Sequence, residues 1–375
     1  MNPLRAEPPS IELIREGRFF LPGPTEVHSS VLQAQSRPLI SHRGEEMRNL
    51  WARLQSGVAA VLGTASPVWI STSSATSMME AAVRSCGARR VVCLVAGAFS
   101  RRFVRIARAS GIDVDLVEVP PDQPHRPEEV AARVASVDAD LVTMVHCETS
   151  TGVLNPVAEL AAAVHGVSDA LVAVDSVSGA GGIPVRPDDW GVDFLLTGSQ
   201  KAFAVPPGLA FAVSSDRFLQ RARGNPRRGL YLDPIAHLEA QEERGGPMTT
   251  PAISCLFALD TQLGRMEAEG LEARFARHRD MQEDVETWLT DLQATGIDVG
   301  RFAPEGAASP TVSVVRLPAG LPSGSVLTAA SAAGYTVAPG YGEWRDTQLR
   351  IGHMGDHTRE GVARLLDVLG PIIRG

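Results

Sequence analysis

The sequence predicts an α/β protein in which helices flank a parallel β-sheet. Between about residues 66 and 215, short β-branched runs alternate with amphipathic segments, which is typical of successive βα units. One such segment carries Phe103 and Ala107 before Gly111, and another begins at Pro156. Seven runs are strand candidates: Val68–Thr72, Val91–Val95, Val114–Val119, Leu141–His146, Leu171–Asp175, Asp193–Thr197 and Leu209–Val213.

The rest of the chain predicts a connector and a second, smaller unit. The charged stretch from Leu263 to Trp288 contains regularly placed apolar residues and indicates a long connecting helix. Beyond it, strands at Thr311–Leu317 and Gln348–Ile351, with helices at Ser325–Ala333 and from Thr358, indicate an α+β unit. We therefore expect an N-terminal segment (1–20), a large domain (21–260), a connecting helix (261–290) and a small C-terminal domain (291–375).

Composition excludes several classes of protein. The 375 residues carry a net charge of −8, so no overall positive field attracts nucleic acid or an anionic membrane. The longest uncharged stretches are broken by Gly, Pro and hydroxyl residues, and the N-terminus, with Glu7, Glu12 and Glu16, lacks the plan of a signal peptide. The four cysteines show no paired spacing, and His353 and His357 lack a third ligand. We expect a cytoplasmic protein with reduced cysteines and no metal site.

Lys201 is the only lysine among the 35 basic residues. A desolvated lysine can lose its proton and attack a carbonyl, which an arginine cannot do, so one retained lysine suggests a Schiff-base residue. It follows the apolar strand candidate Asp193–Thr197, at the strand end where α/β sheets bind ligands. Its apolar or small neighbours would lower the pKa of the amine by desolvation. The alternative, a lysine left by chance on the surface, is disfavoured by this context.

Asp175 ends another strand candidate and precedes a loop of small residues, Ser176–Gly182. A carboxylate at the end of a buried strand needs a partner. A protonated pyridine nitrogen would supply one, and an aspartate there keeps the ring cationic, as the chemistry of pyridoxal phosphate requires. The alternative is an aspartate that caps a helix or orders its own loop.

A hydroxyl-rich turn, Ser73–Thr76, leads from the first strand candidate into a helix. Ser77 and Glu80 have the spacing of a capping box at the start of that helix. The hydroxyls of Ser74 and Thr76, with the free N–H groups of a helix N-terminus, would suit a phosphate group. A capped helix without any ligand explains the same pattern equally well.

Phe99, Val177 and Arg350 are three further residues that could contact a ligand bound near Lys201 and Asp175. Phe99 stands just past a strand and could cover one face of a planar ring, with Val177 on the other face; a core phenylalanine is the alternative. Arg350 interrupts an apolar strand, which is costly for an ion unless it meets a carboxylate. That carboxylate could belong to a ligand or to a structural ion pair.

Six segments together resemble the class V pyridoxal phosphate-dependent aminotransferases, and most closely their alanine–glyoxylate and serine–pyruvate branch. The segments occur in the order of that family between about residues 19 and 370: Pro22–Thr25, Ser73–Thr76, His146–Leu154, Asp175–Ser178, Gly198–Lys201 and Arg350–Gly352. The resemblance implies the fold-type I architecture. This comprises a large domain with a mainly parallel seven-stranded sheet flanked by helices, a smaller α+β C-terminal domain, and a homodimer with its active sites at the interface.

The resemblance also implies a role for each candidate residue. Lys201 resembles the Schiff-base lysine and Asp175 the partner of the pyridine nitrogen, while Arg350 resembles the anchor of the substrate carboxylate. Gly23, between two prolines, would narrow the pocket near that carboxylate, and Thr249 or Thr250 would reach the phosphate of the neighbouring subunit. The remaining cofactor-binding residues by this resemblance are Ser74, Ala75, Thr76, Phe99, Ser150, Val177 and Gln200.

The expected activity is transfer of an amino group from a small L-amino acid, such as alanine, serine or glycine, to glyoxylate or pyruvate by a ping-pong mechanism. An aminotransferase for a phosphonate or a phosphorylated amino acid is the alternative, because Cys147–Pro156 resembles aminoethylphosphonate enzymes and Ser41–Arg43 resembles phosphoserine enzymes. A lyase that uses a mobile cysteine is disfavoured, since no cysteine follows Cys255. A non-catalytic homologue would not need both Lys201 and Arg350.

Overall fold

A computed structural model describes residues 17–375 of the protein. Residues 1–16 lie outside the described part, and with them most of the expected N-terminal segment (1–20) and the residues Glu7, Glu12 and Glu16. No helix in the described range 17–375 is both long enough and apolar enough to cross a lipid bilayer.

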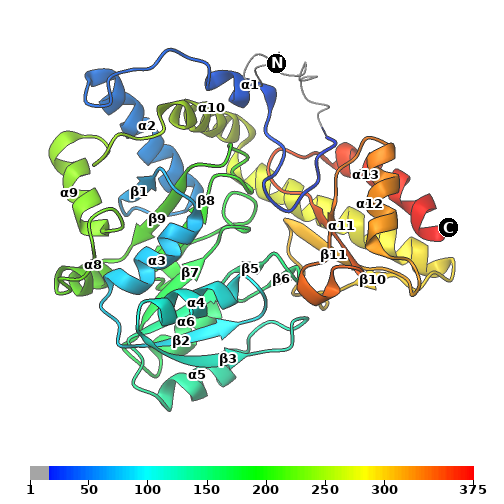
Figure 1. The fold of residues 1–375 in the computed structure, drawn as a ribbon, viewed down its shortest axis with the longest axis horizontal. Coiled ribbons are helices and arrows are strands. Elements are labelled where there is room, and N and C mark those ends of the chain that lie inside the picture. Colours follow the sequence, from blue (N-terminus) through cyan, green and yellow to red (C-terminus); the bar gives the residue numbers. More distant parts are fainter. Residues whose placement is uncertain (1–16) are drawn as a thin grey trace, which may run out of the picture.

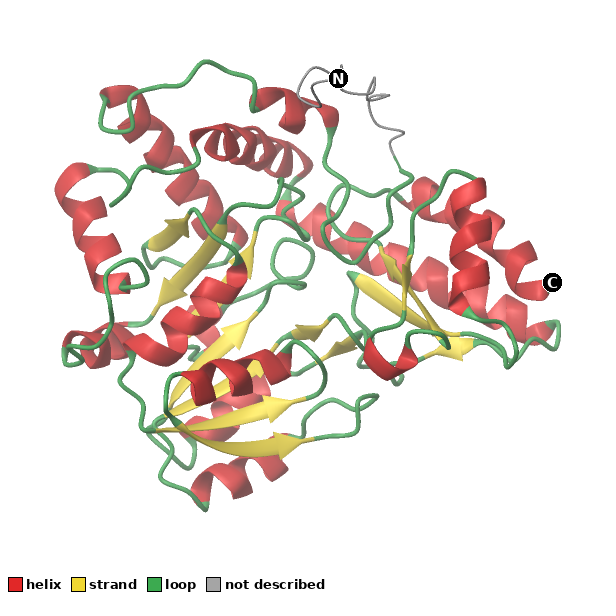
Figure 2. Ribbon diagram, in the orientation of Figure 1, coloured by secondary structure: helices red, strands yellow, loops and turns green. Residues whose placement is uncertain are grey.

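A seven-stranded sheet lies at the centre of the larger part of the molecule (Figures 1 and 2). Its order is β1-β9-β8-β7-β4-β2-β3. Only β9 runs antiparallel to its neighbours, and the remaining strand pairs are parallel. All seven expected strands are confirmed to within two residues: β1 (Val68–Ser71), β2 (Arg90–Val95), β3 (Asp113–Glu118), β4 (Leu141–Val145), β7 (Leu171–Asp175), β8 (Phe194–Gly198) and β9 (Ala210–Ser214).

Helices cover both faces of this sheet because successive strand residues point to opposite sides. In β7, for example, Val172 and Val174 join one core, while Leu171 and Ala173 join the other. The first core is closed by α1 (Ser29–Ala34), α2 (Glu45–Val61), α5 (Pro127–Ala135), α6 (Val157–His165) and α10 (Ile253–Glu269). The second is closed by α3 (Ala75–Ser85), α4 (Ser100–Ala109), α8 (Asp216–Arg223) and α9 (Pro234–Arg244).

A second unit has its own core and a four-stranded antiparallel sheet in the order β10-β11-β13-β12. It contains α11 (Leu271–Ala294), β10 (Gly300–Arg301), β11 (Val312–Arg316), α12 (Ser323–Ala332), β12 (Ala338–Pro339), the short helix η2 (Gly342–Trp344), β13 (Gln348–Gly352) and α13 (Arg359–Arg374). The segment before α1 joins this unit, since Phe20 N–H donates to Thr336 O at 2.8 Å. Figure 1 shows α11 passing from the large sheet to the smaller one.

Two expectations about helices were wrong in detail. The single connecting helix expected over Leu263–Trp288 is interrupted at Gly270, whose φ of +82° lies in the left-handed region and separates α10 from α11. The capping box expected at Ser77 and Glu80 does not form, because α3 begins three residues earlier, with Ser74 rather than Ser77 as its N-cap. Ser77 instead donates to Ser73 Oγ at 2.7 Å, and Glu80 pairs with Arg84 at 2.8 Å.

The topology brings most of the candidate residues to one edge of the large sheet. Since β1, β2, β4, β7 and β8 all point the same way, the loops that follow them share the carboxyl edge of the sheet. That is the edge at which open α/β sheets bind ligands. A short hairpin that we did not expect from the sequence, β5 (Cys147–Glu148) with β6 (Val153–Leu154), follows β4 at this edge.

Candidate active site

Lys201 lies in the loop after β8, with only 8% of its surface exposed. Burial lowers the pKa of its amine to about 8. The nearby Arg350 acts in the same direction, and the negative charges of Asp175 and Glu148 oppose it. Burial also raises the pKa of the Cys147 thiol to about 11, so Cys147 is neutral at pH 7 and adds no charge there. At pH 7 roughly a tenth of the Lys201 amine is therefore unprotonated, far more than for a lysine in water.

Gly23 packs directly against the lysine side chain. A Cβ atom at Gly23 would lie 2.4 Å from Lys201 Cε and 2.7 Å from Nζ, closer than any real contact, and its φ of +115° is a conformation that other residues rarely adopt. The amine donates a hydrogen bond to the carbonyl of Pro22. The N-terminal segment thus holds the lysine in place.

Asp175 is the last residue of β7 and is 6% exposed. Burial raises the pKa of its carboxyl group to about 6, although Oδ1 accepts a hydrogen bond from Val177 N–H at 2.8 Å. The charge of Glu148 raises the pKa further, and Arg102 and Lys201 lower it. With a pKa of about 6, most of the Asp175 carboxyl is ionised at pH 7, and it forms no ion pair among residues 17–375.

The expected phosphate-side residues meet at the N-terminus of α3. Ser74 is its N-cap but makes no side-chain capping bond, and the next residue, Ala75, is buried. Gln200 approaches the same point: a Cβ at Gly198 would lie 2.7 Å from Gln200 Oε1 and 3.3 Å from Ala75 Cβ. The hydroxyl of Thr76 accepts a hydrogen bond from Arg102 at 3.0 Å.

Phe99 lies beside Lys201, and Ser150 contacts the residue before Phe99. The amine is 5.6 Å from the centre of the Phe99 ring. Phe99 precedes α4 as its N-cap, and Ser150 Oγ accepts a hydrogen bond from Ala98 N–H at 3.1 Å. Both residues are tied to Glu148, a fully buried carboxylate that we did not single out in the sequence.

Arg350, in β13 of the smaller sheet, supplies a half-buried guanidinium group. It donates to the carbonyls of Pro339 at 2.9 Å and Thr149 at 3.4 Å, and it lies 5.4 Å from the centre of the Tyr341 ring. Within the described part of the chain it forms no ion pair, so the structural salt bridge that we kept as an alternative is absent there. Burial lowers the pKa of Arg350, and the charge of Glu148 partly opposes this.

Thr249 and Thr250 are the candidates that the structure does not bring into this group. Both are exposed, and the chain beyond them is held by Ala252 N–H, which donates to Thr72 Oγ1 at 2.9 Å. Val177, by contrast, lies two residues after Asp175, to which its N–H donates a hydrogen bond, and packs against the second core. The intersubunit role expected of Thr249 or Thr250 stays a prediction.

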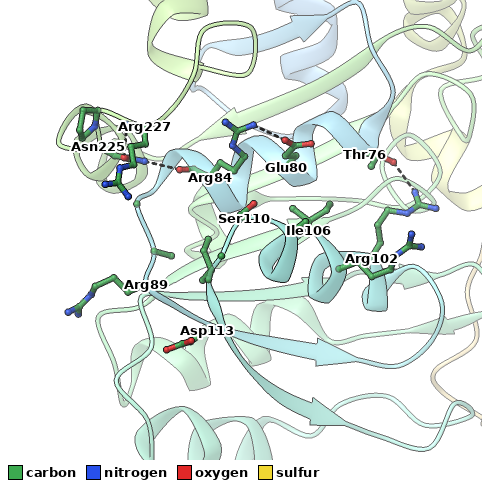
Figure 3. A pocket seen from close by; sticks show the side chains of 17 residues that line it. Thr76, Glu80, Arg84, Arg89, Arg102, Ile106, Ser110, Asp113, Asn225 and Arg227 are labelled. Atoms are coloured by element: carbon green, nitrogen blue, oxygen red, sulfur yellow. Dashed lines mark hydrogen bonds and ion pairs between the residues drawn. The ribbon is translucent and has the colours of Figure 1, made fainter.

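A large groove lies just outside this group of residues. It has a volume of about 1120 Å³ and runs along α3 and α4, as Figure 3 shows. It shares Thr76 and Arg102 with the site, and the Arg102 guanidinium also lies 5.2 Å from the centre of the Phe99 ring. We did not single out Arg102 in the sequence, because nothing distinguishes it there from Arg101 and Arg105.

Comparison with known proteins identifies the family of the chain. The family model described as Aminotransferase class-V matches residues 25–315. An uncharacterised aminotransferase of Methanocaldococcus jannaschii is 33% identical over 344 residues, which are 90% of this chain and 87% of the relative. L-aspartate–glyoxylate aminotransferase of Paracoccus denitrificans is 31% identical, over 91% of this chain and 87% of the relative.

The fold is shared with a solved enzyme as well. The crystal structure of alanine–glyoxylate aminotransferase from Nostoc sp. matches with a TM-score of 0.90 at 27% identity, and the match covers 100% of this chain and 99% of that one. The expected fold-type I fold of the single chain, with its mainly parallel seven-stranded sheet and smaller α+β unit, is thereby confirmed, while the expected homodimer stays a prediction. The chain belongs to the class V aminotransferases, a family of pyridoxal phosphate-dependent enzymes.

Proposed function

We propose that this aminotransferase binds pyridoxal 5′-phosphate through Lys201 and transfers the amino group of a small L-amino acid to glyoxylate or pyruvate. One observation carries the proposal: at the carboxyl edge of the sheet, a buried amine and a buried carboxylate meet a guanidinium that has no carboxylate partner among residues 17–375. Two similar enzymes are named for glyoxylate, with aspartate or alanine as the other substrate. Their names support glyoxylate as the acceptor.

The residues present fit the cofactor. Asp175 offers an ionised carboxylate to a ring nitrogen, and the N-terminus of α3, with Ser74, Ala75 and Thr76, offers N–H and hydroxyl donors to a phosphate. Gln200 joins the phosphate side. Phe99 and Val177 would cover the two faces of the ring, and Ser150 would place its hydroxyl at the ring edge. Bound in this way, pyridoxal phosphate supplies an electron-accepting ring.

The chain itself would handle the substrate and the proton. Arg350 would bind the substrate carboxylate in a bidentate manner. Gly23, which has no side chain, leaves room for the Lys201 side chain that packs against it. The Lys201 amine, with its pKa lowered to about 8, is a base suited to remove a proton from the substrate Cα atom. Thr249 or Thr250 would contact the phosphate of a neighbouring subunit in a homodimer.

A substrate panel tests the proposed activity. The protein, loaded with pyridoxal phosphate, is given L-alanine or L-serine with glyoxylate, and glycine and the new 2-oxo acid are measured. We expect both products in equal amounts, and parallel double-reciprocal plots, as a ping-pong mechanism requires. A strong preference for phosphoserine or an aminophosphonate would overturn the substrate assignment. Binding of the cofactor without turnover of any amino acid would contradict the enzymatic role.

Substitution of Arg350 by methionine tests the substrate anchor. Methionine fills the same space without a charge, so the substrate carboxylate loses a charge-assisted bidentate contact. We expect kcat/KM for L-alanine to fall by about 100-fold, which corresponds to roughly 3 kcal/mol, with an unchanged affinity for pyridoxal phosphate. The matched control is Arg316→Met, at the exposed end of the neighbouring strand β11, which should leave both quantities unchanged. A kcat/KM within twofold of the wild type would contradict the assignment.

A further inference from the structure

Glu148 is a fully buried carboxylate at the N-terminus of α4. It belongs to β5, yet it accepts hydrogen bonds from Phe99 N–H at 3.2 Å, Ser100 N–H at 2.9 Å and Ser100 Oγ at 3.0 Å. It also accepts from Ser150 N–H at 3.2 Å and from the Ser150 hydroxyl. No cation pairs with it within the described residues. Five donors and the positive end of a helix therefore stabilise its charge.

The Glu148 side chain is tightly packed against the main chain at Gly97. A Cβ atom at Gly97 would lie 2.6 Å from Glu148 Cδ and 2.5 Å from Ser150 Oγ, so the main chain before Phe99 touches both side chains. A local Ser, Thr, Asp or Asn at the N-cap normally provides such capping. Here the N-cap is Phe99, which cannot cap with its side chain, and the acceptor comes from a different element of the fold.

Glu148 contacts two residues of the proposed cofactor site, Phe99 and Ser150. It holds Phe99 through the backbone of that residue, and it holds Ser150 through the hydroxyl. Its charge also acts on the two ionisable residues beside it, since it raises the pKa of Asp175 and that of the Lys201 amine. The other charged or titratable groups that act on Lys201 are Cys147 in β5, Arg350 in β13 and Asp175 at the end of β7.

We propose that Glu148 is a positioning residue for amino transfer, which fixes the Phe99 ring beside Lys201 and the Ser150 hydroxyl beside Ala98, and which places a negative charge near the amine. The inference rests on the proposed function, because Phe99 and Ser150 matter as contacts of pyridoxal phosphate. It goes beyond that function by giving the buried glutamate a role of its own, through other residues rather than through the substrate.

Two substitutions of Glu148 distinguish the effect of its position from the effect of its charge. Glu148→Asp keeps the charge but withdraws the carboxylate from the α4 amides by one methylene group. We expect the dissociation constant for pyridoxal phosphate to rise about tenfold, as for the loss of one charge-assisted hydrogen bond. The visible circular dichroism of the bound cofactor should weaken, because the ring loses its fixed position. The pH midpoint for capture of pyridoxal phosphate by the ligand-free protein should stay where it is in the wild type.

Glu148→Gln keeps the length but removes the charge and one acceptor. We expect a similar rise in the dissociation constant and, in addition, a capture midpoint at lower pH. The sign follows because a negative charge favours the protonated amine of Lys201, so its removal lowers the pKa of that amine. Gly97→Ala gives an independent approach: its Cβ would displace the carboxylate without altering its charge, and it should reproduce the result of Glu148→Asp even where Glu148→Gln folds poorly.

Asp193→Asn is the matched control. Asp193 is also buried, at 2% exposure, and accepts from Val172 N–H at 2.9 Å, but it lies at the opposite end of β8 from Lys201. This variant should lose stability while its circular dichroism, dissociation constant and capture midpoint remain those of the wild type. If all Glu148 variants behave like Asp193→Asn, the inference is overturned and the proposed function stands. If the wild type itself does not capture pyridoxal phosphate, both are overturned.

Discussion

Replacing Lys201 by methionine is expected to abolish amino transfer, lowering kcat by about 10⁴-fold or more. Methionine has nearly the length of lysine and suits a side chain that is 8% exposed and packed on Gly23. It carries no amine that could condense with an aldehyde or move a proton. Lys201→Arg should be equally inactive, because a guanidinium group keeps its proton at any physiological pH. Activity in either variant above about 1% of the wild type would contradict the assignment.

The composition of the chain makes the chemical test unusually clean. Lys201 is the only lysine, so the side chains offer a single amine to pyridoxal phosphate. Reduction with borohydride after incubation with the cofactor should add one pyridoxyl group to the peptide that contains Lys201, as measured by mass spectrometry. In Lys201→Met the same peptide should stay unlabelled. Labelling of the α-amino group alone, in the wild type, would show that Lys201 is not the attachment site.

Stability gives a control that does not depend on the cofactor. The pKa of the amine is about 8 in the folded protein and 10.5 for an unperturbed lysine. Between these values the unfolded chain binds more protons, so the free energy of unfolding of the ligand-free wild type should rise with pH, by about 3 kcal/mol in total. Lys201→Met should lack this rise. Its presence in the variant would mean that other groups cause it.

The large sheet could be predicted because most of its strands are short apolar runs between turn residues. Leu171–Asp175, for example, is identical in prediction and structure. The hairpin of β5 and β6 could not, since two-residue strands are too short to show a period of two. The break at Gly270 was missed because an isolated glycine inside a helical pattern is often tolerated. Here its positive φ ends α10 instead.

For the site, ionisable residues at the ends of apolar strands were the informative signal. Lys201, Asp175 and Arg350 could be found in this way, because a charge next to a buried strand requires an explanation. The same signal was present for Glu148, the only charged residue between Asp140 and Glu159, but its contacts to Phe99 and Ser150 come from the tertiary structure. A role of that kind follows from packing and not from local sequence.

Arg274 shows the limit of sequence reasoning most clearly, and its replacement by methionine should destabilise the fold strongly. It lies in the arginine-rich helix α11 but is 1% exposed. It donates to the carbonyls of Gly181 at 2.9 Å and Ala202 at 2.8 Å, next to the Lys201 loop, and to Glu269 and Asp356 at 2.9 Å each. We expect the free energy of unfolding to fall by about 3–5 kcal/mol, as for a broken buried ion pair.

The size of this effect follows from what the substitution leaves behind. Burial alone would raise the pKa of Asp356, and Arg274 beside it holds that pKa below its ordinary value. Without the arginine, Asp356 loses its buried ion-pair partner and keeps only Gln262 and the more exposed Arg265, and the carbonyls of Gly181 and Ala202 lose their donor. Arg53→Met is the matched control, because Arg53 makes an equally direct pair with Asp260 on an exposed surface and should cost less than about 1 kcal/mol. Urea unfolding measures both variants. We expect the larger loss of unfolding free energy for Arg274→Met, because only its ion pair is desolvated. An equal loss in the two variants would contradict a stabilising link from Arg274 to the Lys201 loop.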